Sequence, residues 1–242
     1  MVAVFKLAVN DFKNIIRDKL LISLAILYPI IIITFSQILV QFIAPNLKES
    51  IPIAGNFTIF FFLFLTIIPI IYGFIASFLI LDEKDEHLLT VLRVMPISRN
   101  TYLTYRMLFL SIFSFIVLLI FPPLSGLIEN TQFSYLEYTP IALLFSLLTP
   151  FSAMLVSSFA TNKVQAFAIF KISATIYMLP LFIFLIPDNF KYVFSPAPNF
   201  WAFITLKELL LNGKNDYLYL IIGFFYLVFL ILLLFYIFNK KN

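Results

Sequence analysis

The sequence changes character at residues 81–99, which read Leu81-Asp82-Glu83-Lys84-Asp85-Glu86-His87-Leu88-Leu89-Thr90-Val91-Leu92-Arg93-Val94-Met95-Pro96-Ile97-Ser98-Arg99. Four acids and one lysine fill residues 82–86, directly after the 32 uncharged residues 50–81. An uncharged apolar run of this length is long enough to cross a membrane as a helix. Residues 82–98, which we call the charged segment, therefore mark a place where the chain leaves the membrane.

The composition of the whole chain agrees with this interpretation. Of its 242 residues, 62% are hydrophobic and 12% are charged, and its mean hydropathy is +1.05. Soluble domains carry about 25% charged residues, so water could not solvate most of this surface. The sequence predicts an all-α integral membrane protein with no separate soluble domain.

Six apolar runs are long enough to span a membrane, because a spanning helix needs about 20 apolar residues. They are residues 20–44, 57–81, 102–121, 140–160, 164–186 and 217–238. Prolines inside these runs are compatible with spanning helices, because neighbouring helices can satisfy the freed backbone groups.

Residues 1–19 predict an amphipathic helix that lies in the headgroup region of the membrane. Phe5 and Phe12 fall on its apolar face, and Lys13 and Arg17 fall on its basic face. Helices with this pattern lie in the plane of the interface. The alternative is a solvated extension of the first span.

The charged segment predicts a short helix that begins at about Asp82 and ends at a proline, since the residue before a proline avoids helical conformation. Acids at the start of a helix suit the helix dipole. An apolar stripe follows the acids and could press into a groove of a partner protein. The alternative is an ordinary solvated loop. The candidate contact residues are Asp82, Glu83, Asp85, Glu86 and His87, then Leu88, Val91, Leu92, Met95 and Pro96.

Basic residues predict the orientation, because cytoplasmic segments are enriched in Lys and Arg. With the N-terminus inside, eleven of the 16 Lys and Arg residues fall in cytoplasmic segments and four in outer segments, and Lys171 lies in the fifth span. We therefore expect both termini and the charged segment on the cytoplasmic side of the membrane.

Residues 187–216 predict a short helix on the outer side, between spans five and six. Asn199 is a candidate helix cap, Phe200–Leu211 form the helix, and Gly213 would end it. The helix is too short and too charged to span, so we expect it to be interfacial or re-entrant.

Polar residues inside the spans are candidates for a substrate pathway. They fall on faces of spans one, four and five: Thr34, Gln37 and Gln41; Ser146 and Thr149; Lys171 and Thr175. A charge inside a membrane usually faces the bundle interior or a cavity, which favours Lys171. Two alternatives stay open. Lys171 lies only about 12 Å along the helix from Lys163, so it can reach back to the headgroups, and the hydroxyl and amide faces can join helices by hydrogen bonds.

Several chemistries are excluded by missing motifs. The five glycines are isolated, so no phosphate-binding loop exists. Cysteine is absent, His87 is the single histidine, and no G-x-S-x-G occurs. We expect no catalytic residue, no metal and no cofactor on this chain, and no nucleic-acid partner.

This order of features resembles the ABC-2 type permease subunits of ABC transporters, in particular small bacterial exporters. The resemblance covers nearly the whole chain, and residues 82–99 and 13–20 carry its most specific parts. It implies that the charged segment is a coupling helix that docks on a separate ATPase. It also implies that residues 1–19 are a connecting helix beside that ATPase and that residues 187–216 hold extracellular re-entrant helices.

The resemblance implies an ATP-driven exporter that moves a drug, an antimicrobial peptide or a lipid outward. Mg-ATP would bind to the partner ATPase, and a second copy of the chain or a homologous permease would complete the pathway within the lipid. An ATPase-independent secondary transporter or channel is the alternative. Such proteins often carry acids inside their spans, whereas every Asp and Glu here is predicted to lie outside them.

Overall fold

The computed structural model describes residues 16–17, 19–43, 58–85, 99–128, 134–213 and 215–241. Throughout these residues the regular secondary structure is helical, and six stretches are long and apolar enough to cross a membrane. They are Ser23–Ile43, Thr58–Asp85, Asn100–Ser125, Tyr135–Phe159, Lys163–Phe184 and Tyr217–Lys241. The prediction of an all-α protein with six membrane-spanning helices is confirmed.

The first span alternates between α-helical and π-helical turns. It consists of α2 (Lys19–Ile22), the π-helix η1 (Ser23–Leu27), α3 (Tyr28–Ile38) and the π-helix η2 (Leu39–Ile43). π-Helical turns are rare and are often found at functional sites. The Tyr72 hydroxyl of α5 donates a hydrogen bond of 2.9 Å to the Ala25 carbonyl, which holds η1 against the second span.

The other five spans are built from six helices and one 3-10 segment. They are α5 (Thr58–Asp85), α7 (Arg99–Ser125), α8 (Tyr135–Ser146) with α9 (Leu148–Phe159), α10 (Lys163–Met178) with the 3-10 helix η5 (Leu179–Phe184), and α12 (Tyr217–Lys241). A second 3-10 helix, η6 (Asp188–Phe194), and α11 (Phe200–Asn212) lie between spans five and six.

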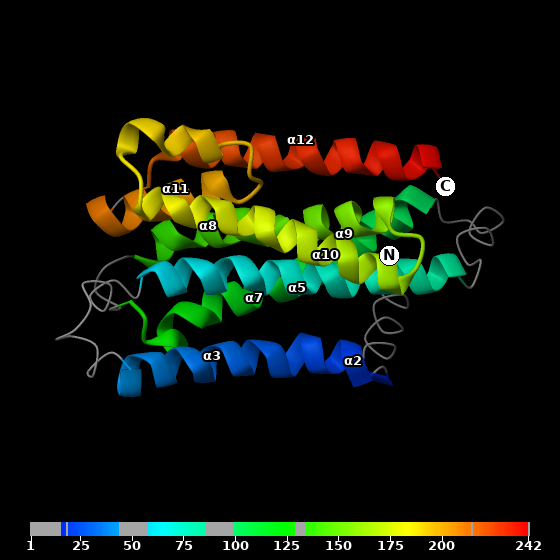
Figure 1. The fold of residues 1–242 in the computed structure, drawn as a ribbon, viewed down its shortest axis with the longest axis horizontal. Coiled ribbons are helices and arrows are strands. Elements are labelled where there is room, and N and C mark those ends of the chain that lie inside the picture. The colour runs from blue at the N-terminus through cyan, green and yellow to red at the C-terminus, as the bar shows by residue number, and fades with distance from the viewer. Residues whose placement is uncertain are drawn as a thin grey trace.

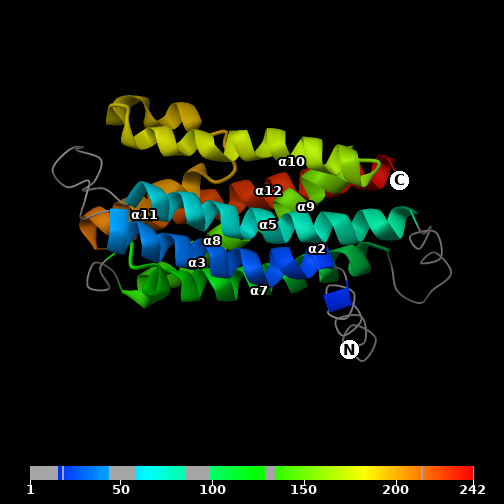
Figure 2. The ribbon, with the colours of Figure 1, turned by 60° about the horizontal axis from the view of Figure 1, so that its bottom comes forward.

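The spans lie side by side in an elongated bundle with α5 in its middle (Figures 1 and 2). The start of α2 and the ends of α5 and α12 lie at one end of the bundle, which we call the α2 end, and α11 lies at the opposite end, the α11 end. Of the most apolar stretches, 78% is buried in α5 and 83% in the α8–α9 span, against 17–33% in the other spans. The centre of the fold is therefore α5 packed on α8 and α9, and the outer spans keep much of their apolar surface free for lipid or for another chain.

Gly73 allows α5 and α9 to approach closely. A Cβ atom at this position would lie 2.6 Å from the Ser152 Cβ and 2.6 Å from the Thr149 carbonyl oxygen, so only a hydrogen fits. The Thr149 hydroxyl donates to the Pro69 carbonyl at 3.0 Å and lies 2.9 Å from the Ser114 hydroxyl. These contacts join α9 to α5 and to α7 in the buried centre.

α5 continues to Asp85, beyond the predicted end of the second span at Leu81. The prediction that Asp82 begins a separate helix is wrong, because Asp82, Glu83 and Asp85 occupy the last turns of α5. Acids at the C-terminal end of a helix oppose its dipole. Cationic side chains of neighbouring helices pair with two of these acids and offset that cost.

α7 also runs past its predicted end at Phe121, through two prolines to Ser125. Pro122 has no N–H to donate to the Leu118 carbonyl four residues earlier. The Tyr138 hydroxyl of α8 donates to that carbonyl instead, at 3.0 Å. The helix tolerates the proline because a neighbouring helix supplies the missing donor.

Two further boundaries of spans four and five differ from the prediction. α8 begins at Tyr135, five residues before the predicted Pro140, where the Ser134 hydroxyl accepts a hydrogen bond of 3.2 Å from the Leu136 N–H. α10 ends as an α-helix at Met178 and continues as 3-10 turns, because a proline two residues later cannot donate in the α-helical pattern.

α11 lies where the sequence predicts a helix between spans five and six, and it ends at Gly213, whose φ of 68° is left-handed. Asn199 occupies the N-cap position of this helix as predicted, but its side chain makes no capping hydrogen bond. Its side-chain amide donates to the Tyr177 carbonyl at 2.7 Å and ties the start of α11 to α10. α11 packs against α8 and α12, and most of its apolar side chains are buried.

We expect Gly73→Ala to destabilise the bundle by about 1–3 kcal/mol, which is typical of overpacking in a core. The added methyl group would meet a backbone oxygen of α9, so the helix itself would have to move. Differential scanning fluorimetry of the purified protein in detergent measures the unfolding temperature. Ala168→Val is the control, since Ala168 is exposed on α10. Equal unfolding temperatures for the two variants would show that α5 and α9 do not approach this closely.

Candidate functional site

A groove of about 500 Å³ opens between the first span, α5 and α10, and we call it the α5–α10 groove. Drug-sized molecules typically occupy pockets of about 300–1,000 Å³, so this groove can hold one. The lining comes from the first span, α5 and α10 in turn: Ser23, Leu24 and Tyr28; Ile67, Ile70, Ile71 and Phe74; Phe167, Phe170, Lys171, Ala174 and Met178.

Aromatic rings from two helices meet in the wall of the groove. The Phe74 ring of α5 lies 5.1 Å from the Phe167 ring and 4.3 Å from the Phe170 ring of α10, measured between centroids. The lining residues of α5 recur at spacings of three and four, so one face of that helix forms the wall. The groove is therefore an apolar, aromatic surface shared by two spans.

Among the described residues that line the groove, Lys171 is the one with a charged side chain, and it is exposed. It shares the groove-facing side of α10 with Phe167, Ala174 and Met178. Thr175, predicted on the same face, does not line the groove, and its hydroxyl donates to the Lys171 carbonyl at 3.3 Å. Of the predicted pathway residues, Lys171 alone lines this groove.

The predicted polar face of the first span lies away from the α5–α10 groove. Thr34 donates to the Ile30 carbonyl at 2.8 Å within its own helix. The Gln41 amide donates to the Gln37 side-chain oxygen at 3.1 Å, and the Gln37 amide donates to the Leu124 carbonyl of α7. The two glutamines thus join the first span to α7 by hydrogen bonds.

The predicted polar face of the fourth span is buried and also lies away from the groove. Ser146 donates to the Leu143 carbonyl at 2.7 Å, and Thr149 joins α9 to α5 and α7 as described above. The Ser152 hydroxyl lies 2.9 Å from the Tyr177 hydroxyl of α10. These hydroxyl groups hold the central spans together.

Two ion pairs fix the last turns of α5 at the α2 end. The Lys163 ammonium at the start of α10 lies 2.7 Å from the Asp82 carboxylate. The Arg106 guanidinium of α7 lies 2.5 Å from the Glu83 carboxylate, and the Arg106 side chain is only 1% exposed. The Tyr102 hydroxyl donates to Glu83, and the guanidinium lies over the Tyr102 ring, 5.1 Å from its centroid.

The last turn of α5, which holds the first residues of the charged segment, is thus tied to spans three and five. The Glu83 carboxylate faces the interior of the bundle, where it pairs with α7, and not a water-exposed surface. Asp85, two residues later, is exposed. A displacement at the end of α5 would pull on α7 and α10 through these pairs.

Of the other residues predicted to contact a partner, only Arg17 lies within the described residues. Arg17 is exposed before α2. The rest lie outside the described residues and stay predictions: Phe5, Phe12 and Lys13; Glu86, His87, Leu88, Val91, Leu92, Met95 and Pro96.

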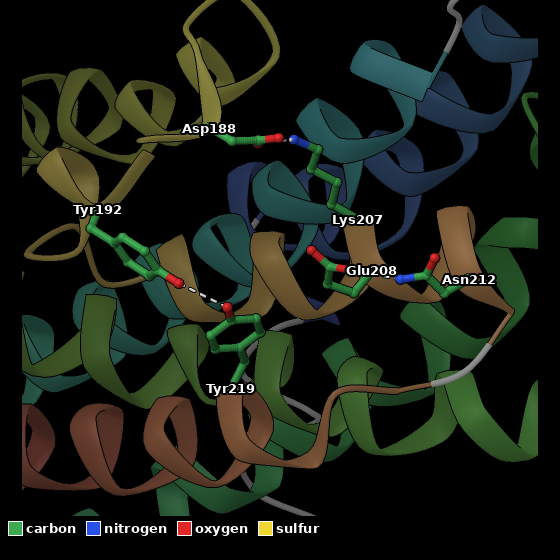
Figure 3. Close-up of polar contacts among 6 residues, drawn as sticks. All are labelled: Asp188, Tyr192, Lys207, Glu208, Asn212 and Tyr219. Carbon is green, nitrogen blue, oxygen red and sulfur yellow. Dashed lines mark hydrogen bonds and ion pairs between the residues drawn. The ribbon is translucent and has the colours of Figure 1, made fainter. Parts of the chain in front are cut away.

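A polar cluster at the α11 end joins the segment between spans five and six to the spans themselves (Figure 3). The Lys207 ammonium of α11 lies 3.3 Å from the Asp188 carboxylate of η6. The hydroxyls of Tyr192 in η6 and Tyr219 in α12 lie 2.8 Å apart. The sequence offered one signal for this cluster, since tyrosines favour the membrane interface.

A second set of contacts at the same end involves α8. The Glu137 carboxylate accepts from the Asn215 backbone N–H at 3.3 Å, and the Asn215 amide donates to the Glu137 carbonyl at 2.5 Å. In α11, Asn212 donates to Glu208 at 2.8 Å (Figure 3). No sequence motif indicated the contacts between Glu137 and Asn215, because these residues lie 78 positions apart in the chain.

The described residues form an apolar groove and ion pairs between neighbouring helices. No group of three or more His, Asp or Glu side chains among these described residues could hold a metal ion. The groove offers apolar aromatic surface and one cation. This combination can bind an apolar molecule and place one charge beside it.

Comparisons with known proteins agree with the export permease that the sequence resembles. A family model described as fluoroquinolones export permease protein Rv2686c-like matches residues 11–235. Two curated relatives, the fluoroquinolones export permease proteins MT2760 and Rv2686c, come from two strains of Mycobacterium tuberculosis. Each is 29% identical over 197 residues, which is 80% of this chain and 77% of the relative. No solved structure is a significant match.

We expect Glu83→Gln to destabilise the protein by about 3–5 kcal/mol, because it leaves the buried Arg106 guanidinium without its carboxylate. Asp82→Asn is the matched control. It breaks an exposed pair of the same chemistry in the adjacent residue, and such pairs contribute about 0–1 kcal/mol. Unfolding in detergent measures both effects.

A double variant makes this prediction sharper. Glu83→Leu combined with Arg106→Met removes both charges of the buried pair. It should be less destabilised than Glu83→Gln, since breaking a buried pair costs more than replacing it. A Glu83→Gln variant no less stable than Asp82→Asn would contradict the buried pair.

Proposed function

This chain belongs to the Rv2686c-like family of fluoroquinolone export permeases, which are of the ABC-2 type, and on this premise we propose that it is the membrane subunit of an ATP-driven exporter. A separate ATPase subunit binds Mg-ATP and hydrolyses it. This chain carries the substrate out through the bacterial cell membrane. The curated relatives are named for fluoroquinolones, and we assign flat, aromatic, amphipathic drugs of that kind to this chain as its substrate class.

One observation supports the proposal above the others: a row of contacts leads from the end of α5 into the α5–α10 groove. The Lys163 ammonium, paired with Asp82, lies 5.6 Å from the centre of the Phe78 ring. The Phe78 ring lies 5.2 Å from the Phe167 ring and 4.4 Å from the Phe74 ring. Both of these rings line the groove. A movement applied at the end of α5 can therefore reach the proposed substrate surface through packed side chains.

The charged segment is placed where a movement of the ATPase would act on this row of contacts. Residues 86–98 of this segment follow α5 directly in the sequence, and the resemblance to ABC-2 permeases assigns the predicted coupling helix to docking on the ATPase. Closure of the ATPase around ATP would push this helix and the end of α5. The ion pairs to α7 and α10 spread that displacement over three spans.

The outer spans supply a surface for a second permease copy. Only 17% of the most apolar stretch of the first span and 22% of that of the fifth is buried, and these two spans flank the groove. Six spans would enclose half of a pathway, and a second copy or a homologous permease would enclose the other half. The α2 end then faces the cytoplasm, as the distribution of basic residues predicts.

A secondary transporter driven by an ion gradient is the rival function. The buried Glu83 of α5 is the acid that could favour it, since intramembrane acids often carry protons. Its carboxylate is paired with Arg106 and accepts the Tyr102 hydroxyl. Those partners stabilise the charged carboxylate, which makes Glu83 a structural group and favours the ATP-driven mechanism.

The proposed function predicts ATP-dependent uptake of a fluoroquinolone into inside-out membrane vesicles that contain this chain and its ATPase. Uptake should stop when ATP is omitted or vanadate is added, and it should persist when a protonophore dissipates the proton gradient. The intrinsic fluorescence of the drug measures uptake. Uptake that needs the gradient and not ATP would establish the rival function.

A second prediction concerns the charged segment. Replacing Leu88 and Leu92 together by Glu should prevent co-purification of the ATPase and abolish ATP-dependent uptake, because the change places charge on the predicted docking stripe. Leu211→Glu is the control, as this side chain is 69% exposed at the α11 end. Unchanged ATPase binding and uptake in the double variant would remove the docking assignment.

A further inference from the structure

We propose that Lys171 recognises the carboxylate of an aromatic substrate bound in the α5–α10 groove. This inference rests on the proposed function, because it takes the groove as part of the export pathway. It adds the substrate feature that the protein selects: an anionic group on one edge of a flat aromatic body. Fluoroquinolones have this chemistry, as their fused rings carry a carboxylic acid.

The walls of the groove favour an aromatic body. Four of the lining residues are aromatic: Tyr28, Phe74, Phe167 and Phe170. Their rings come from three different spans, and the contacts among the phenylalanines include both edge-on and tilted arrangements. Aromatic molecules bind such surfaces through stacked and edge-to-face contacts.

Lys171 supplies the charge complementarity. The described residues that line the groove include no Asp or Glu. Among the described residues, Arg106, Lys163 and Lys207 pair with acids, and no ion pair with a described residue involves Lys171. A cation beside apolar surface inside a membrane is costly unless an anion or water accompanies it. A bound carboxylate would fill that role.

The local backbone places the lysine within reach of the proposed ligand. Phe167, Lys171, Ala174 and Met178 lie on one side of α10 and all line the groove. The neighbouring Ile172 is 65% exposed and does not line the groove. Adjacent residues of an α-helix point about 100° apart, so a charge moved by one residue leaves the groove and keeps its depth in the membrane.

The competing explanation is that Lys171 only extends its ammonium to the headgroups and helps α10 to insert. In that case the depth of the charge matters and its side of the helix does not. Lys171→Met combined with Ile172→Lys separates the two explanations, because this double variant alters the side of the helix that carries the charge and keeps the net charge and the depth.

The experiment measures binding to the full chain in phosphatidylcholine nanodiscs, without ATPase. Phosphatidylcholine carries no net charge, so anionic lipid cannot occupy the site. The probes are a fluoroquinolone and its methyl ester, which share the aromatic body and differ in the carboxylate. Their fluorescence gives the two Kd values after subtraction of binding to empty nanodiscs.

We expect wild type to bind the acid more tightly than the ester, and Lys171→Met to weaken binding of the acid about tenfold with little effect on the ester. Lys171→Arg should keep the preference for the acid. Lys171→Met combined with Ile172→Lys should remain as defective as Lys171→Met, provided that it inserts and is as stable as wild type.

Three results would overturn the assignment. The first is restored acid binding in the combined variant, which would make depth the only property that matters. The second is an equal change for acid and ester in Lys171→Met, and the third is the absence of any acid preference in wild type. Because binding is measured without ATP, these results are distinguishable from failure of the ATP-driven mechanism, which the vesicle experiment detects.

Discussion

The contact between α5 and α9 at Gly73 is the constraint on which the rest of the structure depends. A helix that packs this closely has no room for a side chain at the crossing, and in lipid the two helices gain little from hydrophobic association alone. The gain comes from close van der Waals contact and from the Thr149 hydroxyl, which bonds to the α5 backbone in the buried centre. With this pair in place, the remaining spans can surround it and keep their outer faces apolar.

Because α5 is held at its centre, a movement of this helix would affect both its groove-lining face and the ion-paired acids at its end. Its groove-lining face, from Ile67 to Phe74, lies on the same rigid helix as the ion-paired acids at its end. The same holds for α10, which carries Lys163 at its start and Lys171 two turns later. A change in the angle between these two helices would alter the groove and the Asp82–Lys163 pair together. The fold therefore links the proposed energy input to the proposed substrate surface through two helices.

Much of this fold could be predicted from the sequence, and the failures share a cause. The six spans follow from long, mostly uncharged apolar runs, and the end of α11 follows from the backbone freedom of Gly213. The ends of α5 and α7 could not be predicted, because each depends on a partner from another helix. Arg106 of α7 pairs with Glu83, an acid that would otherwise oppose the dipole at the C-terminal end of α5. The Tyr138 hydroxyl of α8 donates the hydrogen bond that Pro122 cannot donate.

The polar residues inside the spans show the same limit for the candidate site. Spacing along each helix made Thr34, Thr149 and Lys171 equal candidates for a substrate pathway, although their surroundings differ. The Thr149 hydroxyl reaches the backbone of a neighbouring helix, and the Thr34 hydroxyl is satisfied one turn back in its own helix. A hydroxyl can always be satisfied in this way by a nearby carbonyl, so its presence in a span indicates little about transport. An ammonium needs an anion or water, and the described residues that line the groove beside Lys171 supply no carboxylate. This demand for an external partner separates Lys171, for which we propose a role in substrate recognition, from the hydroxyl groups that join the helices.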